Sequence, residues 1–278
     1  MTRFLLSVTR VAIAACSIAA IRTAAVAAPM PQPQHVVVVI EENHSLAQIV
    51  GSTNAAYLNA LAKRGALFVH AHGVTHPSLP NYLALFAGVT NDNGDGCPAT
   101  GFDVHAPNLA SELLAAHRTF AGYAEALPAT GSSVCAAGTY ARKHAPWTEF
   151  ANVPRSLQRP LSALTSFDAL PTVAFIIPDV DNDMHDGTIA QADAWARAHL
   201  DPLVRWADAH DTLLIVTWDE GYDDPNTVPT FFVGPMVKPG RYTQRIDHYN
   251  VLRTLEAMYG LPSIGRARSV ATIAGWWR

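Results

Sequence analysis

The chain has 278 residues, of which 49% are hydrophobic and 15% are charged. This balance is typical of a globular protein with a sizeable core and excludes a chain that is disordered over most of its length. The formal charge is −4 and no run of lysine or arginine occurs, so we expect no nucleic-acid partner, because a phosphate backbone requires a basic face.

The first 27 residues have the pattern of a secretory signal peptide. Arg3 and Arg10 precede an alanine-rich apolar run, and residues 25–27 (Ala-Val-Ala) form a cleavage site of the Ala-x-Ala kind. Arg22 interrupts the apolar run, which leaves it short for a membrane anchor. We therefore expect periplasmic location or secretion with no stable membrane span after cleavage. A lipoprotein attached through Cys16 is the alternative.

After a proline-rich spacer at 28–34, apolar runs alternate with helical patterns. Residues 35–40 (HVVVVI) form a β-branched run, as expected for a strand buried on both faces. The expected strands are 35–40, 66–71, 120–123, 172–177, 212–217 and 230–233, and the expected helices are 55–63, 79–87, 109–116, 189–209 and 248–259. This alternation predicts an α/β fold with a mainly parallel central sheet flanked by helices on both faces. We expect a single domain over 35–278.

Polar clusters follow three of these strands. The first strand runs into Glu42 and Asn43, the fourth into the Asp-rich segment 178–187, and the fifth into Asp219 and Glu220. Ligand sites of such sheets form at the carboxyl ends of the strands, and buried carboxylates require a partner or a cation. The pattern therefore predicts one divalent metal. Oxygen ligands permit Ca, Mg or Mn, and nearby histidines permit Zn or Fe. For any single carboxylate, a helix cap is the alternative.

Ser78 opens the expected helix at 79–87. Free N–H groups at a helix N-terminus favour phosphate, although a serine there can also be a plain N-cap. A serine alkoxide needs a base or a metal, which the acidic clusters can supply. Three of the 12 histidines have suggestive neighbours, namely His144, His185 and His248. Imidazole can bind a phosphoryl oxygen or act as a general acid.

Cys97 and Cys135 are the cysteines that remain after removal of the signal peptide. In an oxidising compartment two cysteines predict one disulfide. Two separate buried thiols are the alternative.

Six segments, in this order, carry a family resemblance: VVVVIEENHS (36–45), HPSLPNYLALFAG (76–88), YARKHAP (140–146), PDVDNDMHDG (178–187), TWDEG (217–221) and DHYNVLRTLEAMYGLP (247–262). Together they cover nearly the whole mature chain. The sequence resembles the bacterial phosphoesterase family that contains acid phosphatases and phospholipases C, within the alkaline phosphatase-like superfamily.

The resemblance implies roles for particular residues. The metal ligands that it implies are Glu42, Asn43, Ser78, Asp219 and Glu220. The groups that it implies around the substrate are Asn43, Asn81, His144, His185 and His248, with Asp183 behind them. Ser78 is the implied nucleophile, and His144 and His185 are the implied catalytic histidines. Position 220 is glutamate where some relatives carry aspartate, and its longer arm makes direct coordination by Glu220 less certain.

The expected activity is that of an acid phosphatase acting on small phosphomonoesters through a phosphoserine intermediate. A phospholipase C-type phosphodiesterase is the alternative enzyme, although we expect no C-terminal lipid-binding extension. A catalytically inactive phosphate-binding protein is the non-enzymatic alternative. A sulfatase is disfavoured, because the sequence after Ser78 lacks the arginine of a formylglycine motif. The expected partner is a small phosphoester, and the sequence sets no oligomeric state.

Overall fold

The computed structural model describes Met1 and residues 29–278, so the expected signal peptide lies outside the described residues. An eight-stranded sheet has the strand order β11-β2-β10-β9-β1-β8-β4-β7. In that order, the strands are Gly240–Tyr242, Ala66–Phe68, Thr230–Val233, Thr212–Trp218, His35–Glu41, Val173–Ile177, Phe120–Ala124 and Gln158–Pro160. The α-helices α1 to α6 are Leu46–Ile49, Ala56–Arg64, Ser78–Ala87, Leu109–Ala115, Ile189–Ala207 and His248–Met258.

Shorter elements complete the fold. Two pairs of short strands stand outside the large sheet: β3 (Ala71–His72) with β12 (Ile246–Asp247), and β5 (Ala136–Ala137) with β6 (Tyr140–Ala141). The 3-10 helices η1 to η7 are Thr53–Ala55, Arg142–His144, Pro146–Glu149, Arg155–Leu157, Leu161–Ala163, Phe167–Ala169 and Gly265–Ser269.

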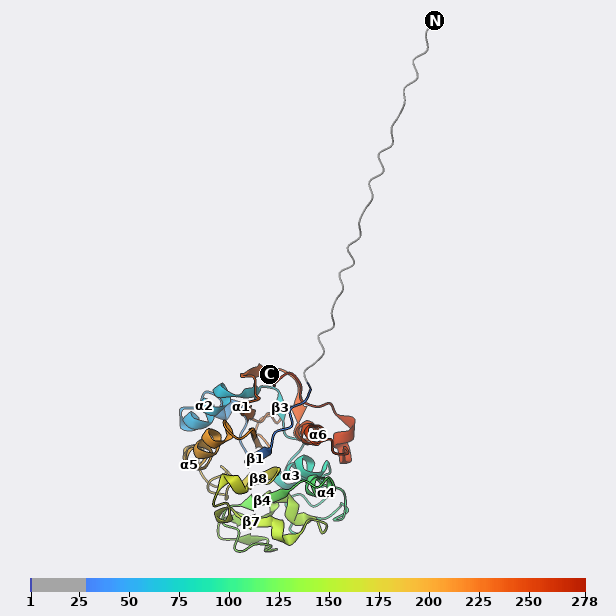
Figure 1. The fold of residues 1–278 in the computed structure, drawn as a ribbon. Coiled ribbons are helices and arrows are strands. Elements are labelled where there is room, and N and C mark those ends of the chain that lie inside the picture. Colours follow the sequence, from blue (N-terminus) through green and yellow to red (C-terminus); the bar gives the residue numbers. More distant parts are fainter. Residues whose placement is uncertain (2–28) are drawn as a thin grey trace.

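The central strands run parallel, as the sequence predicted. Strand β1 pairs in parallel with both β8 and β9, and β4 pairs in parallel with β8 and β7. Only β10, among the paired strands of this sheet, runs antiparallel to its neighbours β9 and β2. Helices α2 and α5 cover one face of the sheet, and α3, α4 and α6 cover the other (Figure 1). The predicted α/β class is therefore confirmed.

Burial explains why β1 and α3 form where they do. The side chains at 36–39 are all valine and fully buried, because helices cover the sheet on both sides. Every residue of α3 is buried, including Ser78 at its start. Gly88 ends α3 in the left-handed conformation with φ +68°, which glycine adopts without a Cβ clash. The helix is thus fixed between the sheet and α6, and Ser78 is fixed with it.

One strand prediction was wrong in its extent. The strand expected at 66–71 ends at Phe68, and the chain turns at Val69 and His70. Residues Ala71 and His72 then pair with β12 in a separate two-stranded sheet. The apolar run alone does not show this turn, because the change of partner depends on the distant segment at 246–247.

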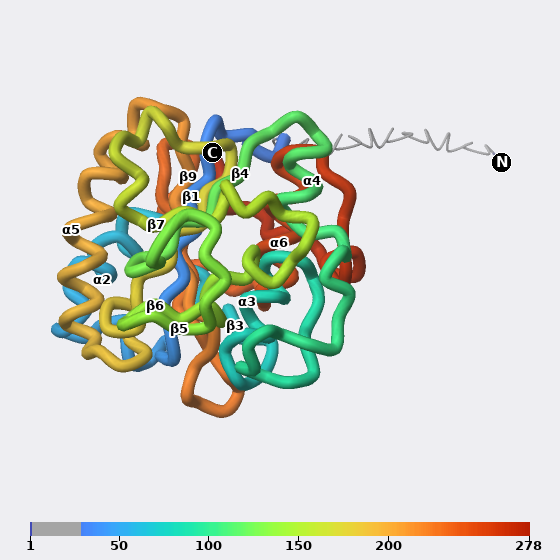
Figure 2. Tube along the Cα trace, turned by 90° about the horizontal axis from the view of Figure 1, so that it is seen from below, coloured from blue at the N-terminus to red at the C-terminus, as the bar shows by residue number. Residues whose placement is uncertain are grey.

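The carboxyl ends of the central strands face the segment that contains the β5–β6 hairpin. Figure 2 shows this hairpin and α3 at the same end of the molecule. Among residues 29–278, no helix is both long enough and apolar enough to cross a membrane.

Candidate functional site

Glu42 lies at the centre of a buried polar cluster, directly after β1. The Ser78 hydroxyl donates to Glu42 Oε2 at 3.0 Å, and the Tyr82 hydroxyl donates to Oε1 at 2.6 Å. Ser78 and Tyr82 are four residues apart on α3, so both side chains project from one face of the helix. The nitrogen Nε2 of His144 lies 3.0 Å from the same Oε1. Segments from three parts of the chain therefore meet at one carboxylate.

Asp219 lies beside this carboxylate, because β9 neighbours β1 and the register pairs Glu41 with Trp218. Asn43 turns the backbone with φ +61°, a left-handed conformation that asparagine tolerates, and its N–H donates to Asp219 Oδ1 at 3.0 Å. The other oxygen, Oδ2, is buried and has no hydrogen-bond partner among residues 29–278. An unpartnered carboxylate oxygen that faces other buried acids is suited to a cation.

Burial favours the protonated form of the acids of the cluster. Burial, followed by the charges of Asp219 and Asp183, raises the pKa of Glu42 well above its ordinary value. Burial, together with Glu220, raises the pKa of Asp219 to about 7, while the side chain of Ser78 is among the groups that lower it. Burial raises the pKa of Asp183 to about 8. A bound cation would favour the ionised form of these acids, so the residues present fit a divalent metal.

His144 bridges two of these acids. Its Nδ1 lies 2.9 Å from Asp183 Oδ2, opposite the Nε2 contact with Glu42. The imidazole stacks on the Tyr82 ring, with centroids 5.3 Å apart and planes 10° apart. Burial, followed by the nearby charge of Lys143, lowers the pKa of His144 well below its ordinary value. Both nitrogens thus lie close to carboxylate oxygens, although Nε2 forms no well-aligned hydrogen bond within the described residues.

His185 lies at the more open side of the cluster. Its Nδ1 is 2.7 Å from Asp186 Oδ1, and its Nε2 is 3.1 Å from Lys143 Nζ. Glu42, His144 and His185 each offer one ligand atom within 4.8 Å of the others. This group overlaps with the ligand set expected from the sequence only at Glu42.

The remaining expected residues surround the cluster. Glu220 Oε2 accepts from Asn81 Nδ2 at 3.3 Å and lies 3.1 Å from His76 Nδ1. Asn81 also accepts from the backbone N–H groups of the segment before Ser78. His248 Nε2 donates to the backbone carbonyl of Asp219 at 2.6 Å, so in this structure it contacts the main chain of a candidate ligand.

The N-terminus of α3 has fewer N–H groups available for phosphate than the sequence suggested. The N–H of Leu79 donates to Asp95 Oδ1 at 2.9 Å, and Pro80 has no N–H. Positive charge near Ser78 must therefore come largely from other groups.

The predicted disulfide is present and joins Cys97 to Cys135. It connects the loop that follows Asp95 with the segment that leads into the β5–β6 hairpin and on to Lys143. The alternative of two separate thiols is wrong for this structure.

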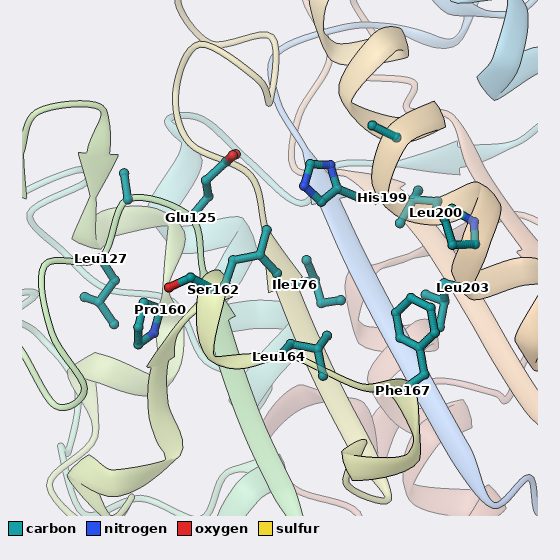
Figure 3. Close-up of a pocket in the computed structure, with 14 residues that line it drawn as sticks. Glu125, Leu127, Pro160, Ser162, Leu164, Phe167, Ile176, His199, Leu200 and Leu203 are labelled. Atoms are coloured by element: carbon teal, nitrogen blue, oxygen red, sulfur yellow. The ribbon is translucent and has the colours of Figure 1, made fainter.

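A separate apolar cavity of about 490 Å³ lies beside α5 and is lined by Leu127, Phe167 and Ile176, among others (Figure 3). Glu125 lies at its edge and accepts a hydrogen bond from the backbone N–H of Asp179 at 3.1 Å. None of the residues around Ser78 lines this cavity, so we place the candidate site at the Glu42 cluster.

Three residues of the cluster were not singled out from the sequence. Tyr82 carries a usable signal, since it lies one helical turn after Ser78. Lys143 directly precedes His144. Asp95 carries no local signal, because its contacts with Leu79 and Lys143 form only in the folded chain.

The sheet topology, with a serine set among buried acids at its carboxyl edge, is that of an alkaline phosphatase-like fold. The fold matches the crystal structure of a protein in the alkaline phosphatase superfamily from Vibrio parahaemolyticus with a TM-score of 0.61. The match covers 88% of this chain and 71% of that chain at 12% identity. The model of the Phosphoesterase family matches residues 52–262, and the chain belongs to that family.

Two curated relatives agree with this assignment. The chain is 52% identical over 258 residues to the phosphatidylinositol-3-phosphatase of Mycobacterium tuberculosis. This alignment covers 90% of this chain and 85% of that protein. It is 32% identical over 232 residues to the phosphate-repressible acid phosphatase of Penicillium chrysogenum, covering 75% of this chain and 55% of that protein. The chain thus spans about half the length of the fungal relative. The expected family and its class, hydrolases of phosphoric monoesters, are confirmed.

Proposed function

We propose that the chain is an exported, metal-dependent phosphomonoesterase that acts through a phosphoserine at Ser78. The observation that carries the proposal is the buried Ser78 hydroxyl, 3.0 Å from Glu42 Oε2, in a cluster where Asp219 Oδ2 has no partner. The single domain expected at 35–278 and the signal peptide at 1–27 are parts of the proposal. The Cys97–Cys135 disulfide supports export, because disulfides persist in oxidising compartments.

The proposed ligands of the metal are Glu42, Asn43, Ser78, Asp219 and Glu220. A divalent cation held there supplies the positive charge that favours the alkoxide of Ser78 over its hydroxyl. Ca, Mg, Mn, Zn and Fe are all compatible with this mixture of oxygen donors and nearby imidazoles. The overlapping group of Glu42, His144 and His185 is an alternative ligand set that retains Glu42.

The chain's own residues account for the remaining steps. Ser78 loses its hydroxyl proton to solvent and its Oγ attacks phosphorus, the bond between phosphorus and the ester oxygen breaks, and the leaving oxygen takes up a proton. His185 is proposed as the donor of this proton because it is the less buried of the two histidines. The proton must be carried on Nε2, which requires that Lys143 Nζ, 3.1 Å away, no longer donates to this nitrogen when the substrate is bound. Water then hydrolyses the phosphoserine, which releases phosphate and restores Ser78.

The names of the relatives guide the choice of substrate. Both the acid phosphatase and the phosphatidylinositol-3-phosphatase cleave phosphomonoesters, as their names state. We therefore propose a phosphomonoester substrate, and a phosphorylated inositol headgroup is the first to test beside small monoesters.

The central experiment compares Ser78→Ala with the wild-type chain in the hydrolysis of p-nitrophenyl phosphate, with divalent metals supplied. We expect a loss of about 1,000-fold or more in turnover, while phosphate or vanadate still binds. Ser52→Ala is the control, because Ser52 caps a short 3-10 helix outside the cluster. Undiminished turnover by the Ser78 variant would remove this residue from the mechanism. Faster hydrolysis of p-nitrophenylphosphorylcholine than of the monoester would favour the phosphodiesterase alternative.

A further inference from the structure

Lys143 lies between the buried acids and the open side of the cluster. Its Nζ is 2.7 Å from Asp95 Oδ2 and 3.1 Å from His185 Nε2. An ammonium group has three donors, so these two contacts leave one N–H for a ligand. The side chain is 20% exposed, which permits contact with a substrate that enters from solvent.

The charge of Lys143 acts on the buried acids of the cluster. It is among the charges that lower the pKa values of Glu42, Asp183 and Glu220. The preceding residue, Arg142, points elsewhere, and its Nε lies 2.8 Å from Glu149 Oε1. Lys143 is therefore the basic side chain of this segment that faces the candidate site.

A phosphate dianion that approaches this site meets several acids and few available donors. The two nitrogens of His144 face carboxylate oxygens at 3.0 and 2.9 Å, His248 donates to a backbone carbonyl, and the N–H of Leu79 donates to Asp95. The equatorial oxygens of a phosphoryl group require donors or cations in the transition state. Lys143 supplies a permanent charge at the place where one is needed.

Asp95 fixes the position of this charge relative to the nucleophile. One of its oxygens accepts from the N–H of Leu79, the residue after Ser78, and the other contacts Lys143 Nζ. A single carboxylate thus connects the start of α3 to the ammonium group. The Cys97–Cys135 disulfide holds the loop of Asp95 to the segment that leads to Lys143.

We propose that Lys143 binds the phosphoryl oxygens of the substrate and that Asp95 positions it beside Ser78. Lys143 is thus a catalytic residue, and Asp95 is a positioning residue. The inference rests on the proposed phosphomonoesterase function and adds the group that recognises the phosphate.

The test measures the binding of inorganic phosphate by calorimetry in the Ser78→Ala background, with divalent metal supplied. Lys143→Met is expected to weaken phosphate binding by about 10- to 100-fold, since a charge-assisted hydrogen bond is lost. Lys143→Arg keeps the charge and is expected to retain most of the affinity. Lys63→Met, an exposed lysine of α2, is the matched control and is expected to bind as the parent does.

Asp95→Asn tests the positioning role. The amide removes the negative charge that holds Lys143, so phosphate binding is expected to weaken, by less than in Lys143→Met. Combined with Lys143→Met, it is expected to cause no further loss, because its effect acts through the lysine. A merely structural role would give additive losses instead.

Phosphate affinity of Lys143→Met within twofold of the parent would overturn the inference, as would additive losses in the double variant. Loss of bound metal together with phosphate affinity in Lys143→Met would also overturn it, and metal analysis of each variant detects this loss. If Lys143→Met does not fold, Lys143→Gln replaces it in the comparison with Lys143→Arg. Failure of the proposed function is distinguishable, because the chain with Ser78 intact would then hydrolyse no phosphomonoester.

Discussion

Replacement of Tyr82 by phenylalanine tests whether Glu42 is held as a metal ligand. The Tyr82 hydroxyl donates to Glu42 Oε1 at 2.6 Å, and both side chains are buried. A hydrogen bond to a charged group contributes about 1.5–3 kcal/mol. Outer partners of metal ligands typically account for about 10- to 100-fold in metal affinity or activity. We therefore expect Tyr82→Phe to raise the metal concentration for half-maximal activity by about 10- to 100-fold, measured by adding metal back after chelation.

Tyr140→Phe is the matched control. The Tyr140 hydroxyl is also buried but has no hydrogen-bond partner in the described part of the chain, so its removal is expected to change half-maximal activation by less than twofold. The stacking of ring 82 on His144 is retained in Tyr82→Phe, which limits the change to the hydroxyl. A Tyr82→Phe protein that responds to metal as the wild type does would refute the view that this hydroxyl orients a ligand.

Three further predictions concern stability. Because the folded-state pKa values of Asp183 (about 8) and Asp219 (about 7) lie above those of the unfolded chain, stability falls as pH rises from about 4 through these values. The melting temperature in chelator is thus expected to be higher at pH 5 than at pH 8, and added metal should reduce the difference; an opposite slope would contradict the assigned shifts. Reduction of the Cys97–Cys135 disulfide is expected to lower the free energy of unfolding by about 2–4 kcal/mol, and urea unfolding with and without reductant checks this. Gly122→Ala in β4 is expected to lower the free energy of unfolding by about 1–3 kcal/mol, because the new Cβ would lie 2.1 Å from the indole ring of Trp147. An unchanged urea midpoint would disprove that clash.

The sequence was sufficient to predict the central strands and their direction. The runs at 35–40, 172–177 and 212–217 are nearly continuous and apolar. Runs of this kind are typical of parallel strands that are buried on both faces. It was not sufficient for β7 and β11, which have three residues each and contain Pro160 and Gly240. Strands of that length form because a neighbouring strand offers free backbone groups, and no local pattern records the neighbour.

Some residues of the candidate site could likewise be predicted from the sequence, and others could not. Residues at strand ends converge because parallel strands share an edge, so Glu42 and Asp219 could be placed together from the sequence. The sequence could not show that the histidine at 144 would lie between Glu42 and Asp183, because both contacts depend on how the 140–146 segment packs against α3. The position of Asp95 depends likewise on a loop that no periodic pattern describes.

The burial of the acids around Ser78 links metal binding to pH. In the metal-free molecule, protons stabilise Glu42, Asp183 and Asp219, because each pKa is raised by burial. A cation at the proposed ligands must displace protons from Glu42 and Asp219, so its apparent affinity must fall as pH falls. A phosphatase with this site that works in acid therefore needs tighter intrinsic metal binding than one that works at neutral pH. The hydrogen bond from Tyr82 holds the carboxylate of Glu42 in place for the proposed cation, and such preorganisation would be a direct way to increase that affinity.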